Sequence, residues 1–354
     1  MNGIIVINKP QEMTSFDCVA IMRRKLGIKR IGHLGTLDPM ATGVLPIAVG
    51  KATRIMDYLD MDIKEYVGEI AFGLRSDTDD IWGKIVPSNK SDRTLIVDKV
   101  DVEKALACFR GVIDQVPPIY AAIKKDGKKL YEYARKGQNI EIESRKIYIE
   151  SIELMDFTER KSFYEGTLKP GEAGVINLPA CPAAVIRIRC SKGTYIRSIA
   201  RDIGEKLGCG AVLSGLIRTS SGAFKYADSI NMNTIMSLPD YKNREDYLGD
   251  IGLDQVIENE IGKKLFPVDY ALGYFPKVDL GDWESKLFST GVKLRSNQWQ
   301  VSRDFYEGES VINSFPLELK EDFRNLYRVY GKNGFIGTGL KLETGELKAD
   351  KVLA

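Results

Sequence analysis

Several segments of this chain alternate apolar and polar residues with the period of a β-strand. Residues 184–190, AVIRIRC, place every second residue from Ala184 to Cys190 on an apolar side and both arginines on the other. That pattern predicts a strand with one buried face. Further strands are predicted at residues 3–8, 66–73 and 146–155.

Other segments follow helical spacing. Between Ile196 and Leu207 apolar residues recur at i, i+3, i+4, i+7 and i+11, which predicts an amphipathic helix with Thr194 as its cap and an end near Gly208. A second helix is predicted from Ser15, its expected cap, to a stop at Gly27. Its predicted apolar positions are Phe16, Val19, Ala20 and Leu26, and a shorter helix is predicted at residues 102–109.

The sequence pattern changes after Pro267. Residues 328–353 form short strand-like runs separated by Lys-Asn-Gly and Glu-Thr-Gly-Glu, which are typical hairpin turns. Before them, residues 156–183 read as a strand pair or extended loop, and residues 228–264 as short helices and loops. Periodicity alone therefore predicts only an α+β protein, and the C-terminal runs indicate a small β-rich domain at the end of the sequence.

Composition sets the class of protein. A length of 354 residues with 44% apolar content is typical of globular domains with a substantial core. We find no run of about 18 apolar residues, so we expect no membrane span. The first ten residues predict a strand and not a signal peptide. The five scattered cysteines form no C-x-x-C pair, which favours free thiols in a reducing cytoplasm.

The net charge of +2 conceals an uneven distribution. Residues 23–54 contain seven basic residues and one acid, and residues 120–136 contain six basic residues and two acids. Residues 240–262 contain seven acids and two basic residues. The basic stretches could hold phosphates, and solvated surface is the alternative for each of them.

One loop combines unusual residues. The segment RIGHLGTLDPMATGVLPIAVGKATR contains the only histidine, His33, and a single carboxylate, Asp38. Proline after Asp38 favours an extended backbone, and the glycines allow close approach of a ligand. A catalytic carboxylate and a local Asx turn both fit these residues. The loop lacks the G-x-x-x-x-G-K-[ST], G-x-G-x-x-G and G-x-S-x-G motifs, as does the rest of the chain.

Two other charged features are candidates for chemistry. Arg197 lies in the first turn of its predicted helix, where a guanidinium could keep a buried carboxylate ionised, and a surface or phosphate-binding arginine is the alternative. The run RSDTDD at residues 75–80 could bind a metal ion, but a solvated acidic turn is favoured.

Five blocks, in order, carry a family resemblance. They are INKPQEMTSFDCV, GHLGTLDPMATGVLPIAVGKATR, KEYVGEIAFGLRSDTDD, PPIYAAIKKDGKKLYEYARKG and CSKGTYIRSIARDIGEKLGCGAVLSGLIRTSSGAF. Together they resemble the TruB family of tRNA pseudouridine synthases, which act on tRNA position 55. The resemblance implies a catalytic domain at 1–266 with a large mixed, mostly antiparallel sheet flanked by helices, followed by a PUA-like RNA-binding domain at 277–354. It favours catalysis over the Asx turn for Asp38.

The resemblance also implies roles for individual residues. Asp38 would be the catalytic aspartate, Tyr66 would stack on the target base near its C5 proton, and Arg197 would pair with Asp38. The implied substrate-binding residues are His33, Leu216 and Lys9, together with Lys124, Lys128, Lys129 and Arg135 in a basic insert at about 117–150.

The implied reaction breaks the glycosidic bond of a flipped uridine, turns the uracil and rejoins it through C5. One ionised aspartate can attack the sugar, stabilise it or abstract a sugar proton, and no metal or cofactor is expected. The implied partner is the tRNA T-arm, bound by a cytoplasmic monomer without an obligate protein partner. The alternatives are an RNA-binding or tRNA-folding protein without catalysis, a guide-dependent relative, and a hydrolase of small glycosides.

Two positions depart from the family pattern. Glu12 stands where the family usually has glycine, which would be strained if the backbone there has φ > 0. Trp82 stands where an acidic residue is common.

Overall fold

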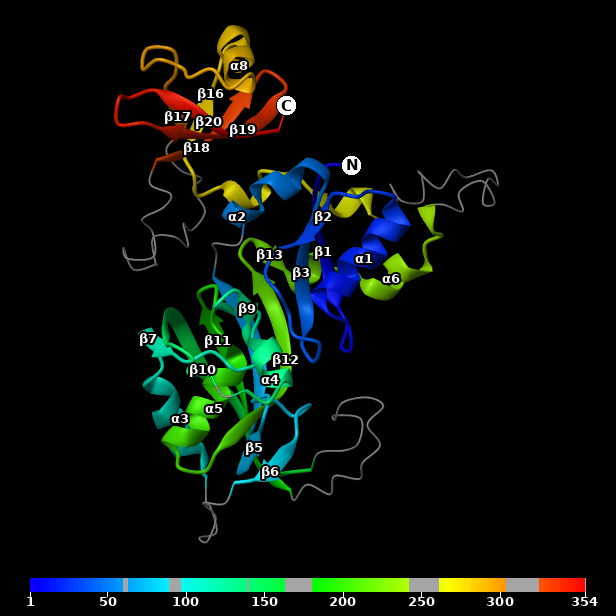
Figure 1. The fold of residues 1–354 in the computed structure, drawn as a ribbon, viewed down its shortest axis with the longest axis vertical. Helices are drawn as coiled ribbons and strands as arrows, with labels where there is room; N and C mark the ends of the chain where they lie inside the picture. The colour runs from blue at the N-terminus through cyan, green and yellow to red at the C-terminus, as the bar shows by residue number, and fades with distance from the viewer. Residues whose placement is uncertain are drawn as a thin grey trace. The chain divides into compact units, whose positions relative to one another are not determined.

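A computed structural model describes residues 1–59, 63–88, 97–138, 140–162, 180–241, 261–303 and 325–353. The chain divides into two compact units (Figure 1). The first unit contains residues 1–38, 43–62 and 220–354, and the second contains residues 39–42 and 63–219. The predicted domain boundaries at 266 and 277 stay a prediction.

The first unit contains a sheet in which β1 pairs antiparallel with β3 and parallel with β14. Its elements are β1 (Gly3–Lys9), α1 (Ser15–Leu26), β2 (Ile31–His33), β3 (Thr42–Val49), the 3-10 helix η1 (Gly50–Ile55), α2 (Met56–Leu59), β13 (Phe224–Lys225), η3 (Tyr226–Asp228), β14 (Ile230–Asn231), α6 (Met232–Ser237), η5 (Gly262–Lys264), β15 (Leu265–Phe266) and η6 (Tyr270–Leu272). The predicted first strand is confirmed.

The C-terminal part of this unit forms its own sheet, in the order β17-β16-β18-β19-β20. Its elements are β16 (Lys277–Asp279), α8 (Asp282–Ser289), β17 (Val301–Arg303), β18 (Leu326–Gly331), β19 (Gly334–Lys341) and β20 (Leu347–Val352). The two predicted turns separate β18, β19 and β20, so the predicted β-rich C-terminal domain is confirmed.

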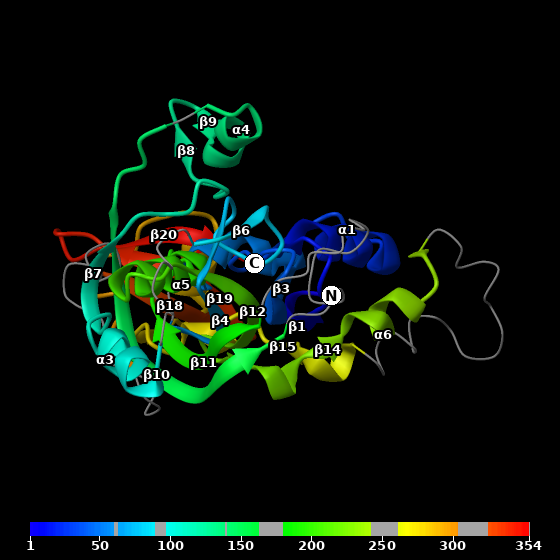
Figure 2. The same cartoon turned by 90° about the horizontal axis from the view of Figure 1, so that it is seen from below.

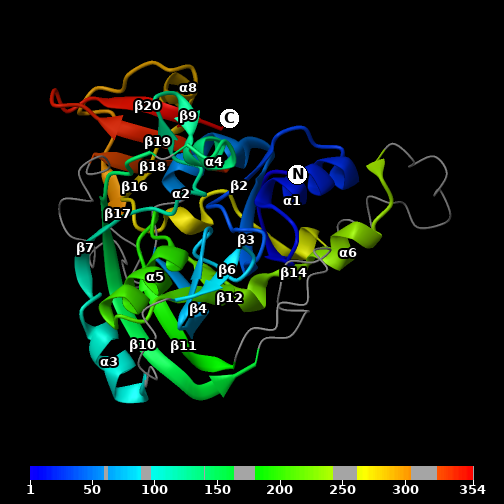
Figure 3. The ribbon, with the colours of Figure 1, turned by 60° about the horizontal axis from the view of Figure 1, so that its bottom comes forward.

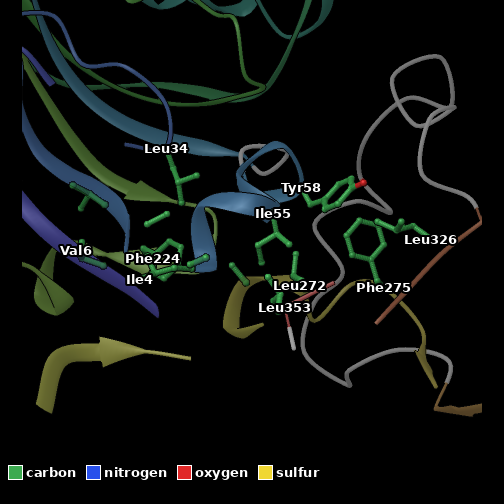
Figure 4. Close-up of a cluster of buried hydrophobic side chains, with 14 residues drawn as sticks. Ile4, Val6, Leu34, Ile55, Tyr58, Phe224, Leu272, Phe275, Leu326 and Leu353 are labelled. Carbon is green, nitrogen blue, oxygen red and sulfur yellow. The ribbon is translucent and has the colours of Figure 1, made fainter. Parts of the chain in front are cut away.

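A single cluster of buried side chains joins the C-terminal strands to the N-terminal ones (Figure 4). Leu34 and Ile55 from the N-terminal segment share it with Leu272, Leu326 and Leu353. In Figure 4 Ile55, Leu272 and Leu353 lie together, and Tyr58 and Phe275 lie between them and Leu326. The C-terminal sheet therefore contributes a few residues to this cluster, and it has a core of its own that includes Val278, Phe288 and Val329.

Polar contacts reinforce this junction. The hydroxyl of Tyr58 in α2 donates to the Asp350 carboxylate in β20, which also accepts from Thr338 at 3.0 Å. Burial, followed by the hydrogen bond and charge of Asp350, raises the pKa of Tyr58 well above its usual range. The Tyr58 hydroxyl therefore stays protonated as the donor in this pair.

The second unit contains a sheet in the order β12-β4-β11-β10-β7. Its elements are β4 (Lys64–Phe72), β5 (Leu74–Ser76), β6 (Ile85–Pro87), α3 (Lys99–Ala107), β7 (Gly111–Gln115), β8 (Lys124–Lys125), β9 (Lys128–Lys129), α4 (Leu130–Arg135), β10 (Arg145–Lys161), β11 (Cys181–Cys190), α5 (Ile196–Lys206) and β12 (Ala211–Ser221). The pairs β4–β11, β11–β10 and β10–β7 are antiparallel. Figure 3 shows α3 beside β10.

The described elements confirm the predicted α+β class and the mixed, mostly antiparallel sheets. The predicted strands at 66–73, 146–155 and 184–190 and the predicted helices are present, with the burial alternation expected of β11. Residues 163–179 and 242–260 lie outside the described residues, so the interpretation of segments 156–183 and 228–264 is tested only at their edges. No described helix is long and apolar enough to cross a membrane.

Three predicted details of the helices are wrong. Thr14, and not Ser15, caps α1, and the cap of α5 is Tyr195 without a side-chain hydrogen bond. Phe16 and Ala20 of α1 are exposed, whereas Cys18 and Met22 are buried. The predicted stop of α1 at Gly27 is confirmed by its left-handed backbone, φ 67°.

The suspected strain at Glu12 is present, because its φ is 70°. We expect Glu12→Gly to stabilise the protein by about 0.5–1 kcal/mol, since glycine adopts this conformation without a Cβ clash but loses more entropy on folding. Urea denaturation of both proteins measures the change. Glu12→Ala is the matched control and should leave stability close to wild type, because alanine keeps the strain. A destabilised Glu12→Gly protein would contradict this reading.

Candidate active site

The loop that carries Asp38 is held firmly on its N-terminal side. The Leu34 amide donates to the Pro46 carbonyl at 2.9 Å. The Leu37 amide donates to Ser15 Oγ at 2.9 Å, and that hydroxyl donates to the Leu37 carbonyl at 3.2 Å. Leu34 and Leu37 are buried, whereas Asp38 is half-buried. The loop therefore offers a partly exposed carboxylate on a backbone fixed by its neighbours.

Two glycines shape the same loop. Gly35 and Gly43 have φ values of 69° and 102°, in the region that favours glycine, so a side chain at either position would be strained. His33 lies at the end of β2, opposite Ile47 in β3, and is half-buried. Its predicted role toward the substrate stays a prediction.

The first motif builds the support for this loop. Lys9 is fully buried, and its Nζ donates to the carbonyls of Pro10 and Met13 at 2.7 Å each, which closes the turn before α1. Thr14 and Asp17 then form a capping box. Hydrogen bonds from the Thr14 side chain and amide lower the pKa of Asp17. The turn and the cap fix the start of α1, from which Ser15 reaches the Asp38 loop.

In the second unit, Tyr66 lies on the covered face of β4. Its side chain is buried, with 7% exposed, and Gly68 follows two residues later on the same face. A methyl group at Gly68 would lie 3.5 Å from Ile196 at the start of α5 and 3.6 Å from Leu216 of β12. Leu216 and α5 therefore pack over the strand face that carries Tyr66.

Arg197 is buried at the N-terminal end of α5, and its contacts fix its orientation. One terminal nitrogen donates to the Thr78 carbonyl at 3.0 Å and lies 3.7 Å from the Asp80 carboxylate. The other donates to the Tyr120 carbonyl at 3.2 Å. Asp80 is also buried. The structure thus gives Arg197 a carboxylate in its own unit, and its predicted pair with Asp38 stays a prediction.

The acidic run at residues 75–80 is not the solvated turn that was favoured. Asp80 is buried and accepts from the Trp82 amide at 3.0 Å, and Asp79 pairs with Arg201 at 3.0 Å. Burial raises the pKa of Asp79, and Arg201 opposes this shift. No described group of three or more His, Cys, Asp or Glu side chains could hold a metal ion. The turn serves as a partner for the arginines of α5.

The basic insert contains a short two-stranded ribbon and a helix, which Figure 2 shows as a separate group of β8, β9 and α4. Lys124 and Lys128 are exposed on this ribbon, whose turn residues Asp126 and Gly127 have φ values of 50° and 78°. Lysines occupy all four paired positions, and facing like charges destabilise a ribbon unless an anion neutralises them. The side chains of two further predicted residues, Lys129 and Arg135, lie outside the described part of the chain.

Known family models match all of the second unit and part of the first. Residues 23–196 match the model of the TruB family pseudouridylate synthase N-terminal domain, and residues 197–272 match that of the tRNA pseudouridylate synthase B C-terminal domain. The chain belongs to the TruB family. Relatives include the tRNA pseudouridine synthase B of Geobacillus thermodenitrificans, 38% identical over 83% of this chain and 86% of that protein. The enzyme of the same name from Clostridium tetani is 35% identical over 98% and 97%.

Solved structures agree with TruB membership at the level of the fold. A chain of a Cbf5-Nop10-Gar1 complex has a TM-score of 0.64 at 23% identity, covering 99% of this chain and 85% of that one. A chain of an H/ACA ribonucleoprotein bound to a substrate RNA has a TM-score of 0.62 at 22% identity with the same coverage. The pseudouridine synthase fold inferred from the resemblance is confirmed.

The structure of this TruB protein also reveals supporting residues that the sequence analysis missed. Ser15 was assigned to a helix cap but holds the Asp38 loop, and Asp80 was assigned to solvent but faces Arg197. The spacing Thr14-x-x-Asp17 is a capping-box signal. It would have assigned the cap to Thr14 and left Ser15 available for another contact. No local signal marks Asp80, since its partner is distant in sequence.

Proposed function

We propose that this protein converts a uridine of tRNA into pseudouridine. Membership of the TruB family, with relatives named tRNA pseudouridine synthase B at 35–38% identity over most of the chain, carries the proposal. In this reaction the bond between N1 and C1′ breaks and a bond between C5 and C1′ forms. N1 gains a proton and C5 loses one, so the composition of the nucleotide is unchanged.

The target is the uridine at position 55 in the T-loop, and Asp38 is the catalytic carboxylate. A retaining glycosidase needs two carboxylates because one must protonate its leaving group. Uracil leaves as a stabilised anion that stays bound, so one ionised carboxylate acting on the sugar is enough. The partial exposure of Asp38 and its anchored backbone support this role.

Tyr66, Leu216 and Arg197 complete the proposed chemistry. Flipping a base out of its stack costs a few kcal/mol, which aromatic and apolar walls offset. Tyr66 and Leu216 provide such walls and share one face of the second unit's sheet. In this proposal Tyr66 acts at C5, where the proton is lost, and Arg197 is assigned to the Asp38 carboxylate. His33 and Lys9 support the bound nucleotide and its loop.

The basic insert binds the T-arm, and the C-terminal PUA-like strands contact the acceptor region. RNA stems are recognised mainly through shape and backbone, which suits exposed lysines on a ribbon. The protein acts in the cytoplasm as a monomer, without a metal, cofactor or obligate protein partner.

Salt dependence tests the role of the insert. We expect Lys124→Ala and Lys128→Ala each to reduce the slope of log K for tRNA against log salt concentration by about 0.7–0.9, because each removes about one phosphate contact. Filter binding at several salt concentrations measures the slope. Lys99→Ala, at an exposed lysine of α3, is the matched control and should leave the slope unchanged. Equal slopes for wild type and all three variants would show that Lys124 and Lys128 do not contact RNA phosphates.

Tritium release from a tRNA transcript labelled at uridine C5 tests the proposed function. We expect wild-type protein to release one equivalent per tRNA without other macromolecules. Release that requires an added guide RNA would identify a guide-dependent enzyme, and free uracil as product would identify a hydrolase. Tight, salt-sensitive tRNA binding without any release would favour an RNA-binding or RNA-folding protein.

A further inference from the structure

Hydrogen bonds join the N-terminal half of α5 to residues 115–120. This segment begins at the last residue of β7 and leads into the basic insert. The Gln115 side chain is buried and contacts Tyr195, the residue before α5. Its Nε2 donates to the Tyr195 carbonyl at 3.1 Å, and its Oε1 accepts from the Tyr195 amide at 2.9 Å. Two hydrogen bonds from one side chain thus fix the end of β7 to the residue that precedes the helix.

Two side chains of α5 converge on the next residue. The Val116 carbonyl accepts from Ser198 Oγ at 3.0 Å and from a terminal nitrogen of Arg201 at 2.9 Å. Further along, the Tyr120 carbonyl accepts from Arg197 at 3.2 Å. The base of the insert is therefore attached to one helix on both sides of the dipeptide Pro117-Pro118, whose φ angles are restricted by their rings.

The same arginines hold the turn at residues 78–80. Arg197 binds the Thr78 carbonyl and faces Asp80, whereas Arg201 binds Asp79 at 3.0 Å. Asp79 has a φ of 61°, a strained conformation for a residue other than glycine. Arg197 and Arg201 are one helical turn apart, so they share a face of α5 and hold the same two segments.

We propose that Arg201 is a positioning residue that couples the base of the basic insert to the orientation of Arg197. The inference rests on the proposed function, because it assigns Arg201 a task through Arg197 and the RNA-binding insert. A displacement of the insert pulls on the Val116 and Tyr120 carbonyls together. Arg201 ties the Val116 carbonyl to Asp79, beside the Thr78 and Asp80 groups that orient Arg197. The contact of the insert with RNA therefore reaches Arg197 through a short, polar and partly buried connection.

Arg201→Lys tests whether a positive charge at residue 201 is sufficient, or whether the two hydrogen bonds of the guanidinium to Asp79 and the Val116 carbonyl are required. Lysine keeps a positive charge near Asp79 but lacks the planar fork that reaches Asp79 and the Val116 carbonyl together. We expect the single-turnover rate of tritium release to fall about 10- to 100-fold, as small misplacements of catalytic groups do, while the tRNA Kd stays within about threefold of wild type. Lys206→Arg is the control, since Lys206 is an exposed basic residue in the last turn of the same helix, and we expect a wild-type rate.

A double variant tests whether Arg201 merely neutralises Asp79. Asp79→Asn combined with Arg201→Gln removes both charges, so a neutralising role predicts that the rate returns to wild type. Coupling through the Val116 carbonyl predicts that the rate stays low in this folded protein. Melting temperatures of all variants are measured first, and rates are compared below the lowest transition.

Ser198→Ala provides the test if the Arg201 variants do not fold. It removes the other side-chain hydrogen bond to the Val116 carbonyl without a change of charge, and we expect a slower single-turnover rate at unchanged Kd. Wild-type rates in both Arg201→Lys and Ser198→Ala, or in Ser198→Ala alone if only that variant folds, would overturn the coupling. Absence of release by the wild-type protein in the same assay would instead overturn the proposed function.

Discussion

Asp38→Asn should bind tRNA with unchanged affinity and release tritium at least about 10²-fold more slowly than wild type. A positioned carboxylate that exchanges protons in the transition state contributes about 10²–10⁴-fold, and a carboxylate that forms a bond to the sugar contributes more. Asparagine preserves the size of the side chain and the hydrogen bonds of the Leu37 backbone to Ser15, so the loop should keep its shape.

Single-turnover tritium release and filter binding measure the two effects separately. Asp57→Asn is the matched control, because it makes the same chemical change in α2 of the same unit. We expect it to react at the wild-type rate. An Asp38→Asn protein with wild-type release would remove Asp38 from the reaction and leave the RNA-binding alternative in place.

Arg197→Met should destabilise the protein by about 3 kcal/mol and also abolish catalysis. Removing one partner of a buried ion pair leaves the other charge uncompensated, which typically costs 3–5 kcal/mol. Asp80 retains its hydrogen bond from the Trp82 amide, so we expect the lower end of this range. Urea denaturation followed by tryptophan fluorescence measures the loss.

The double variant Asp80→Asn with Arg197→Met distinguishes stability from catalysis. It removes both charges, and we expect it to regain about 1–2 kcal/mol of the loss, since the hydrogen bonds of Arg197 to the Thr78 and Tyr120 carbonyls stay absent. Tritium release should remain abolished. If stability and release returned together, the role of Arg197 would be structural only.

Local sequence patterns predicted much of the fold because they depend on neighbouring residues. The alternation of β11 and the spacing in α5 reflect one buried face each, and such faces repeat within a few residues. The cap of α1 was misplaced by one residue because Thr14 and Ser15 are both good caps, and only the partner Asp17 distinguishes them. Phe16 was expected inside, but the buried stripe of α1 passes through Cys18 and Met22 instead.

The supporting contacts of the candidate site depended on residues far apart in the chain. Asp79 and Asp80 lie in a polar run that reads as a surface turn, yet their partners Arg197 and Arg201 follow more than a hundred residues later. Lys25 likewise looks like an ordinary surface residue, but its ammonium group is buried against Asp240 at 2.8 Å. The family resemblance identified candidates such as Asp38, whereas pairings of this kind required the fold.

The buried cluster of the first unit has a consequence for the order in which the chain matures on the ribosome. Leu34 and Ile55 are synthesised before residues 63–219, whereas their neighbours Leu326 and Leu353 are synthesised after them. Residues 63–219 are continuous in sequence and can fold while synthesis proceeds, as domains generally do. The cluster around Leu34 and Ile55 is therefore completed only after the whole second unit has been synthesised.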